Sequence, residues 1–230
     1  MDVAAGWYAV ALADGLARGT SAGTRLFGRE LVVWRDAVGA SHVWEDRCPH
    51  RGMRLSFGFV RDNHIACLYH GWQYDTAARC RYIPAHPDIQ VPDSIRVATY
   101  ASVERLGMVW AYSETDRDAP DLAPPAECAP VTPVRSLTID APVARVLAGL
   151  GGAGAAGPVR LVVDDAEIVA AVQPLSETGT VLHLVIAGPP DNWRGAGQKR
   201  VSSWGEALRR KLELPDIVPP AAAASLGVAP

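Results

Sequence analysis

The sequence predicts an all-β antiparallel sandwich followed by a small α+β unit. Residues 1–116 contain short apolar runs separated by Gly and Pro, a pattern typical of β-sandwiches and barrels. Residues 134–215 contain four more strand-like runs and then one amphipathic helical pattern, in which apolar residues recur every three or four positions. These two observations favour a large β domain joined to a smaller mixed one.

The elements of each unit are predicted from their apolar runs. In the first unit the strands are expected at 7–12, 31–35, 42–45, 65–68, 96–100 and 107–112. In the second unit strands are expected at 134–139, 159–163, 167–173 and 180–186, and a helix at 198–214. Residues 117–133 are rich in proline and are predicted to be a linker. Residues 216–230 are rich in Ala and Pro and are predicted to be a disordered tail.

Composition argues against several classes of function. The chain has 230 residues, a formal net charge of −3 and no run of basic residues, so we expect no nucleic-acid binding. No apolar stretch reaches the roughly 18 residues that a membrane-spanning helix needs, and we see no secretory signal. We therefore expect a soluble, cytoplasmic protein. Its four cysteines, which include Cys80 and Cys128, then favour metal binding over disulfides.

Two short segments each pair one cysteine with one histidine. One residue separates Cys48 from His50, two separate Cys67 from His70, and sixteen lie between His50 and Cys67. Two such loops side by side can hold two irons bridged by two sulfides, with the cysteines on one iron and the histidines on the other. The pattern predicts a [2Fe–2S] cluster whose cofactor-binding and metal-binding residues are Cys48, His50, Cys67 and His70.

Two other interpretations of the same four residues are weaker. Structural zinc usually binds C-x2-4-C or H-x3-5-H pairs rather than mixed Cys/His loops of this form. Alternatively, the cysteines could belong to the core and the histidines to the surface. This second alternative does not explain why a glycine follows each histidine within two residues, at Gly52 and Gly71.

The segments around both loops resemble the Rieske domain of ring-hydroxylating and demethylating oxygenases. The matching residues include 44–52, 55–58, 67–75, 83–85 and 104–110, and the resemblance covers about residues 5–115. It implies an antiparallel β-sandwich with a cluster-binding subdomain. Quinol-oxidising Rieske proteins instead have extra cysteines and a serine where this chain has Met53, Tyr69 and Trp72. Because the cluster then accepts fewer hydrogen bonds, we expect a potential low in the Rieske range.

Ala78 departs from the family pattern, which usually has glycine in this turn. If the turn needs a positive φ, alanine destabilises it.

The resemblance also implies a second iron site, which the sequence does not supply. Complete oxygenases of this family hold a mononuclear iron with two histidines and one carboxylate. Here only His183 lies beyond residue 116, and it is expected to be an ordinary packed or surface residue. We interpret the second unit as a shrunken helix-grip domain, with residues 149–157 marking a deletion. The glycines at 149, 151 and 154 match a dinucleotide fingerprint, but Pro158 follows them, so a flexible loop is predicted.

Three functional hypotheses follow. The first is a one-electron carrier between an NAD(P)H-dependent reductase and an oxygenase subunit, with its oligomeric state left open. The second is a terminal Rieske oxygenase subunit whose mononuclear iron site is unusual or supplied by a partner; a redox sensor or a scaffold subunit is a third possibility. No catalytic residue is assigned. Arg47, Arg51 and Arg54 flank the first loop and either orient an acidic partner or serve as ordinary surface charges.

Overall fold

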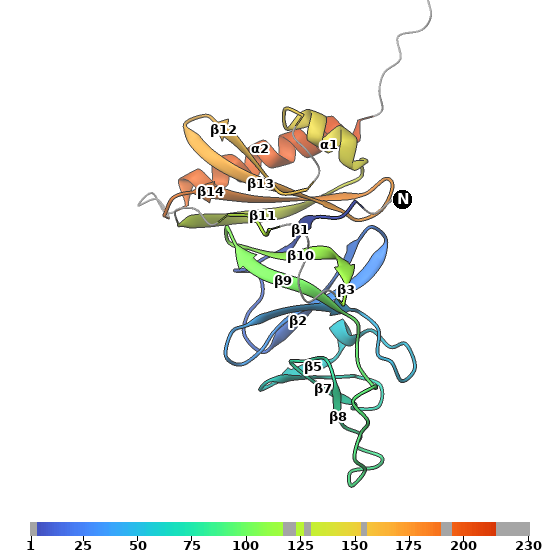
Figure 1. The fold of residues 1–230 in the computed structure, drawn as a ribbon. Coiled ribbons are helices and arrows are strands. Elements are labelled where there is room, and N and C mark those ends of the chain that lie inside the picture. The colour runs from blue at the N-terminus through green and yellow to red at the C-terminus, as the bar shows by residue number, and fades with distance from the viewer. Residues whose placement is uncertain (1–3, 117–122, 127–129, 153–155, 190–194, 215–230) are drawn as a thin grey trace, which may run out of the picture.

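The computed structural model describes residues 4–116, 123–126, 130–152, 156–189 and 195–214. In this part of the chain, three antiparallel sheets are stacked along the molecule, with two α-helices at one end (Figure 1). The mostly β fold confirms the predicted fold class. Neither α-helix in the described ranges is long and apolar enough to cross a bilayer.

The central sheet has six strands in the order β1-β10-β9-β4-β3-β2. Its strands are β1 (Trp7–Leu12), β2 (Thr20–Leu26), β3 (Arg29–Arg35), β4 (Ser41–Glu45), β9 (Thr99–Arg105) and β10 (Met108–Thr115). The two-residue loop 27–28 joins β2 to β3 and the loop 106–107 joins β9 to β10. Both residues of each loop have positive φ, as type I′ hairpins require. The strand expected at 96–100 begins only at Thr99.

A small four-stranded sheet is inserted between β4 and β9. It contains β5 (Phe59–Arg61), β6 (His64–Ala66), β7 (Gln73–Asp75) and β8 (Cys80–Tyr82) in sequence order, and the short 3-10 helix η1 (Leu55–Phe57) precedes it. Each strand has only three residues, too few to show a clear alternation of apolar and polar residues. For this reason the sequence predicted only β6 of the four. Figure 1 shows this lobe at the end of the molecule opposite the helices.

The third sheet has the order β11-β14-β13-β12. Its strands are β11 (Val131–Ile139), β12 (Pro158–Val163), β13 (Ala166–Pro174) and β14 (Thr180–Ala187). Helix α2 (Ala196–Glu213) follows the sheet, close to the predicted 198–214, whereas helix α1 (Val143–Gly149) was not predicted. The β11 strand begins inside the range 117–133 that the sequence assigns to a linker. Residues 117–122, residues 127–129 with Cys128, residues 153–155 and the predicted tail at 216–230 lie outside the described residues.

Helix α2 packs very closely on the third sheet. The closest approach is at Gly205, where a Cβ atom would lie 2.7 Å from Leu137 Cδ1 and 2.9 Å from Leu184 Cδ1. Such distances are below any normal carbon–carbon contact, so a larger residue would force the two leucine side chains or the helix to shift. Buried side chains of both helices and of β11–β14 form one continuous core in the space between them.

The opposite face of the third sheet packs on the central sheet. Trp7 and Trp110, from β1 and β10, share a buried cluster with Val169 and Val185, from β13 and β14. The two predicted units therefore share a hydrophobic interface. Whether their boundaries match the predicted 1–116 and 134–215 remains a prediction.

A chain of buried hydrogen bonds runs beside this interface. The Gln173 amide nitrogen donates to Thr24 Oγ1 at 2.8 Å and to the Arg25 carbonyl at 2.6 Å. The Gln173 Oε1 atom is thus left to accept from His183 Nε2 at 2.8 Å, and His183 Nδ1 accepts from Ser136 Oγ at 2.7 Å. The expectation that His183 is a packed residue fits this position, where it is 2% exposed.

This environment makes the stability of the protein sensitive to acid. Burial lowers the pKa of His183 to about 4, although the backbone of Ala9 opposes the shift. The unfolded chain takes up a proton near the ordinary pKa of 6.5, so stability is lost as the pH falls from 6.5 towards 4.

We predict that, between pH 7 and pH 5, the natural protein loses about 2 kcal/mol more unfolding free energy than the variant His183→Gln. Urea unfolding at the two pH values measures this difference. Parallel losses in the two proteins would show that His183 is not buried in its neutral form.

Candidate metal centre

The two Cys/His segments form loops with the same backbone hydrogen bonds. In the first loop the Cys48 N–H donates to the Met53 carbonyl at 2.8 Å, and the Gly52 N–H donates to the Cys48 carbonyl at 2.8 Å. The second loop repeats both bonds at the same offsets, with Cys67 N to Trp72 O at 2.9 Å and Gly71 N to Cys67 O at 3.0 Å. This repeat orients the two cysteines alike.

Glycine is needed at one position of each loop. Gly52 has a φ of 73° and Gly71 a φ of 69°, values that other residues adopt at a cost. At Gly71 a Cβ atom would also lie 2.9 Å from Pro84 Cγ. The spacing of the two glycines behind the histidines, visible in the sequence, therefore has a direct conformational cause.

The structure brings the four predicted ligands together as two pairs. The Cys48 and Cys67 side chains are each 2% exposed, and their thiols are close enough to interact. The imidazole rings of His50 and His70 lie 4.6 Å apart, with His70 on the exposed side. Across the described ranges, no three His, Cys, Asp or Glu side chains gather around a single point.

The protonation of these groups suits metal binding in part. Burial raises the pKa of Cys67, and the neighbouring Cys48 adds to this, so in the metal-free site a proton stays on this pair. Burial, His70 and Arg51 lower the pKa of His50, which keeps its ring neutral. The Nδ1 atom of His50 is buried and has no hydrogen-bond partner among the residues that the structure describes. A neutral imidazole with one unused buried nitrogen fits a metal ion as the missing partner.

Aromatic side chains stack on both histidines. Trp72 lies over His50 with ring centroids 4.3 Å apart and planes within 4°, and Tyr69 lies over His70 at 3.8 Å and 27°. The stacked position of Trp72 restricts the orientation of the His50 ring.

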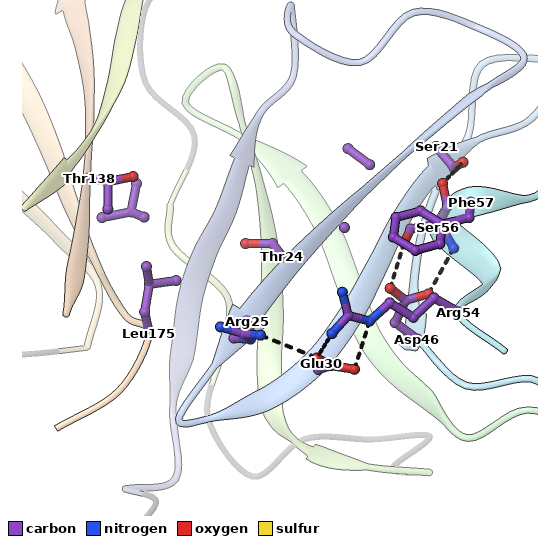
Figure 2. Close-up of a pocket in the computed structure, with 13 residues that line it drawn as sticks. Ser21, Thr24, Arg25, Glu30, Asp46, Arg54, Ser56, Phe57, Thr138 and Leu175 are labelled. Carbon is purple, nitrogen blue, oxygen red and sulfur yellow. Dashed lines mark hydrogen bonds and ion pairs between the residues drawn. The ribbon is translucent and has the colours of Figure 1, made fainter. Parts of the chain in front are cut away.

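Ion pairs and hydrogen bonds, partly buried or exposed, anchor the first loop at both ends (Figure 2). The Asp46 carboxylate accepts from Ser56 N at 2.7 Å and from Ser56 Oγ at 2.6 Å. The Glu30 carboxylate accepts from both Arg54 and Arg25, and the bond to Arg54 is the main cause of its lowered pKa. These contacts tie the loop to β2 and β3 of the central sheet.

The structure also shows the backbone conformation at Ala78, where the sequence departs from the glycine usual in the family. Ala78 has a φ of 62° and is completely buried in the cluster of side chains that surrounds Cys48 and Cys67. The turn therefore does use a positive φ, and alanine there is strained. Cys80, in the same core, is buried and hydrogen-bonds weakly to the Tyr82 carbonyl.

A scan against protein-family models matches residues 6–101 to the Rieske [2Fe-2S] domain. The match contains both loops and all four candidate ligands. Residues 6–101 are a Rieske domain. The predicted resemblance and the predicted [2Fe–2S] cofactor are thereby confirmed. The assignment of individual ligands is our proposal: we propose that Cys48 and Cys67 hold one iron and that His50 and His70 hold the other.

Relatives of this Rieske domain include an oxidoreductase and an oxygenase subunit. It is 38% identical over 105 residues to the oxidoreductase NdmD of Pseudomonas putida, covering 45% of this chain and 18% of that protein. It is 39% identical over 98 residues to the 3-chlorobenzoate-3,4-dioxygenase oxygenase subunit of Comamonas testosteroni, covering 42% of this chain and 23% of that protein. These matches therefore span only about a fifth of each relative.

The fold similarity extends beyond the Rieske domain. The crystal structure of apo dicamba monooxygenase matches with a TM-score of 0.69 and 17% identity, covering 90% of this chain and 84% of that one. At this low identity the match shows the fold alone. It reaches past residue 101 into the unit containing β11–β14, so the resemblance of that unit to an oxygenase domain is supported as a similarity of fold.

One functional contact of the Rieske domain was not predicted. Tyr74, on β7, is completely buried and its Oη atom lies 3.0 Å from Cys48 Sγ. Burial raises the pKa of Tyr74, so the hydroxyl stays protonated and donates to the sulfur when Cys48 is a thiolate. A donor to a ligand sulfur stabilises the reduced, more negative cluster and raises its potential.

We predict that Tyr74→Phe lowers the midpoint potential by on the order of 50 mV. The reason is that one hydrogen bond contributes about 1 kcal/mol, and about 59 mV is a tenfold change for one electron. A redox titration measures the shift. The matched control is Tyr112→Phe, because the Tyr112 hydroxyl is buried with no hydrogen-bond partner in the described part of the chain and its ring packs at the interface of the two units. Equal midpoint potentials in Tyr74→Phe and the natural protein would show that the Tyr74 hydroxyl does not influence the potential of the cluster.

Proposed function

We propose that this chain carries single electrons from an NAD(P)H-dependent reductase to an oxygenase component. A [2Fe–2S] cluster takes up and releases one electron at a time, and the relatives support iron–sulfur electron transfer or an oxygenase role. The finer assignment to a carrier rests on the arrangement of the site. The cytoplasmic location and the possible oligomer predicted from the sequence remain predictions.

The accessible side of the site supports the carrier role. Cys48 and Cys67 are buried, whereas His70 is exposed and His50 is partly so. The proposed iron on the histidines is thus the one nearer to solvent. An electron partner docked on this side has the shortest path to the cluster.

The second unit supports the same choice. The only histidine beyond residue 116 is His183, and both of its ring nitrogens are already hydrogen-bonded, to Ser136 and Gln173. The close approach of α2 at Gly205 fills the space between this helix and the sheet with core side chains. Neither feature favours a second iron or a buried substrate site in this unit.

The alternative is a terminal oxygenase subunit whose mononuclear iron site is unusual or supplied by a partner. The observation that favours it is the fold similarity to dicamba monooxygenase over 90% of the chain. The two functions predict different metal contents and different consumption of oxygen.

We predict that protein produced with ample iron and sulfide contains equal amounts of the two and takes up one electron per chain. Iron and acid-labile sulfide assays and a coulometric titration measure these values. Cys67→Ser, which removes one proposed ligand but keeps the side-chain size, should lose the cluster. A third iron per chain, together with NADH-dependent oxygen uptake, would support the oxygenase alternative and contradict the carrier role.

A further inference from the structure

Exposed apolar side chains are concentrated on the lobe that carries the two loops. Of the nine large hydrophobic side chains exposed in the described residues, six lie between Phe57 and Ile89. Two of these, Leu68 and Tyr69, are 49% and 55% exposed and lie in the second loop beside His70. Leu68 and Tyr69 are adjacent in the chain, and neighbouring exposed apolar side chains favour an interaction site over singly scattered ones.

Two free cations border the same surface. Arg47 and Arg51 are exposed on the first loop, and neither forms an ion pair with another residue of the described ranges. Arg54, the third arginine of this segment, is committed to Glu30. Arg51 directly follows His50, and the ring of His50 lies 4.6 Å from that of His70, so this cation lies beside the loop that carries Leu68 and Tyr69.

A hollow of about 810 Å³ lies beside the first loop and is lined by Arg29, Arg47, Arg51 and Gly52. Three acidic residues also line it, and Glu30 is the one paired with arginines, Arg54 and Arg25. The hydrogen bonds from the uncharged Ser56 do not offset the charge of Asp46, so Asp46 and Glu45 both count against the cations. The three arginines therefore outnumber these two carboxylates by one, although the whole chain has a net charge of −3.

We infer that Arg47, Arg51, Leu68 and Tyr69 form the docking face for the electron partner, and that this partner is an acidic protein. The inference rests on the proposed carrier function. A positive patch on a negative chain orients an acidic partner, because every other approach is less favourable. The apolar residues at the centre of the face then hold the complex once water is expelled.

The test uses the full chain with its cluster and two probe proteins of opposite charge. The donor is a reduced, acidic plant-type [2Fe–2S] ferredoxin, whose potential near about −400 mV drives the electron downhill. The counter-probe is oxidised cytochrome c, a basic protein that accepts electrons from the reduced chain. Stopped-flow absorbance gives the second-order rate constant for each.

We predict that Arg47→Glu combined with Arg51→Glu slows transfer from the ferredoxin about tenfold or more at low salt and speeds transfer to cytochrome c. High salt should reduce both effects, because it screens exposed charges. The matched control is Arg210→Glu combined with Lys211→Glu, the same charge change on the exposed side of α2. The milder pair Arg47→Gln and Arg51→Gln gives a smaller shift of the same sign and replaces the first variant if that fails to fold.

The apolar part of the face is tested separately. Leu68→Ser should lower the second-order rate constant of electron transfer with both probes about threefold to tenfold, without shifting the midpoint potential. Val162→Ser, which alters a side chain 69% exposed on β12, should leave both rates unchanged.

Three results would overturn the inference. One is that the arginine variants keep a normal cluster spectrum and show unchanged rates. Another is that Val162→Ser, or the double variant on α2, changes the transfer rates as much as the variants of the docking face do. The third is that millimolar inorganic phosphate inhibits only when the arginines are present while Leu68→Ser has no effect, which would assign the cations to a small anion. Absence of a cluster from the natural protein would instead refute the proposed function itself.

Discussion

The convergence of two loops, each offering one cysteine and one histidine, is the constraint on which the rest of the structure depends. Each loop closes through the same pair of backbone hydrogen bonds and turns at a glycine with positive φ, Gly52 in one and Gly71 in the other. The resulting geometry places two thiols in the interior and two imidazoles towards solvent. Within this small lobe the cysteine pair is therefore buried, and the histidine pair is the more accessible of the two.

Hydrogen bonds and ion pairs connect this lobe to the rest of the fold. Asp46 and Glu30 anchor the first loop to the central sheet, and the hydrogen bonds of Gln173 connect that sheet to the next one. These contacts link segments up to 149 residues apart. The lobe, the central sheet and the third sheet therefore form one connected structure. For a carrier, such rigidity keeps the reorganisation that accompanies each electron transfer small.

Much of the site could be predicted because its chemistry is local. The four candidate ligands and the two glycines that follow them lie within 24 residues, from Cys48 to Gly71. Each loop can therefore be recognised from a few adjacent positions. Tyr74 escaped assignment because its role depends on how β7 turns its side chain towards Cys48, a contact across 26 residues. Helix α1 and most of the three-residue strands of the lobe were not predicted, because such short elements show no clear apolar pattern. The hydrogen-bond partners of His183 were not predicted either, because they lie on other strands.

The central claim is that two histidines bind one iron of the cluster. Pulsed EPR of the reduced protein, grown with ¹⁵N-labelled histidine, tests it most directly. The account predicts two strongly coupled nitrogens that carry the ¹⁵N label, and the loss of one of them, or of the whole cluster, in His70→Cys. A reduced cluster without histidine nitrogen coupling, showing only the signal of four sulfur ligands, would contradict it.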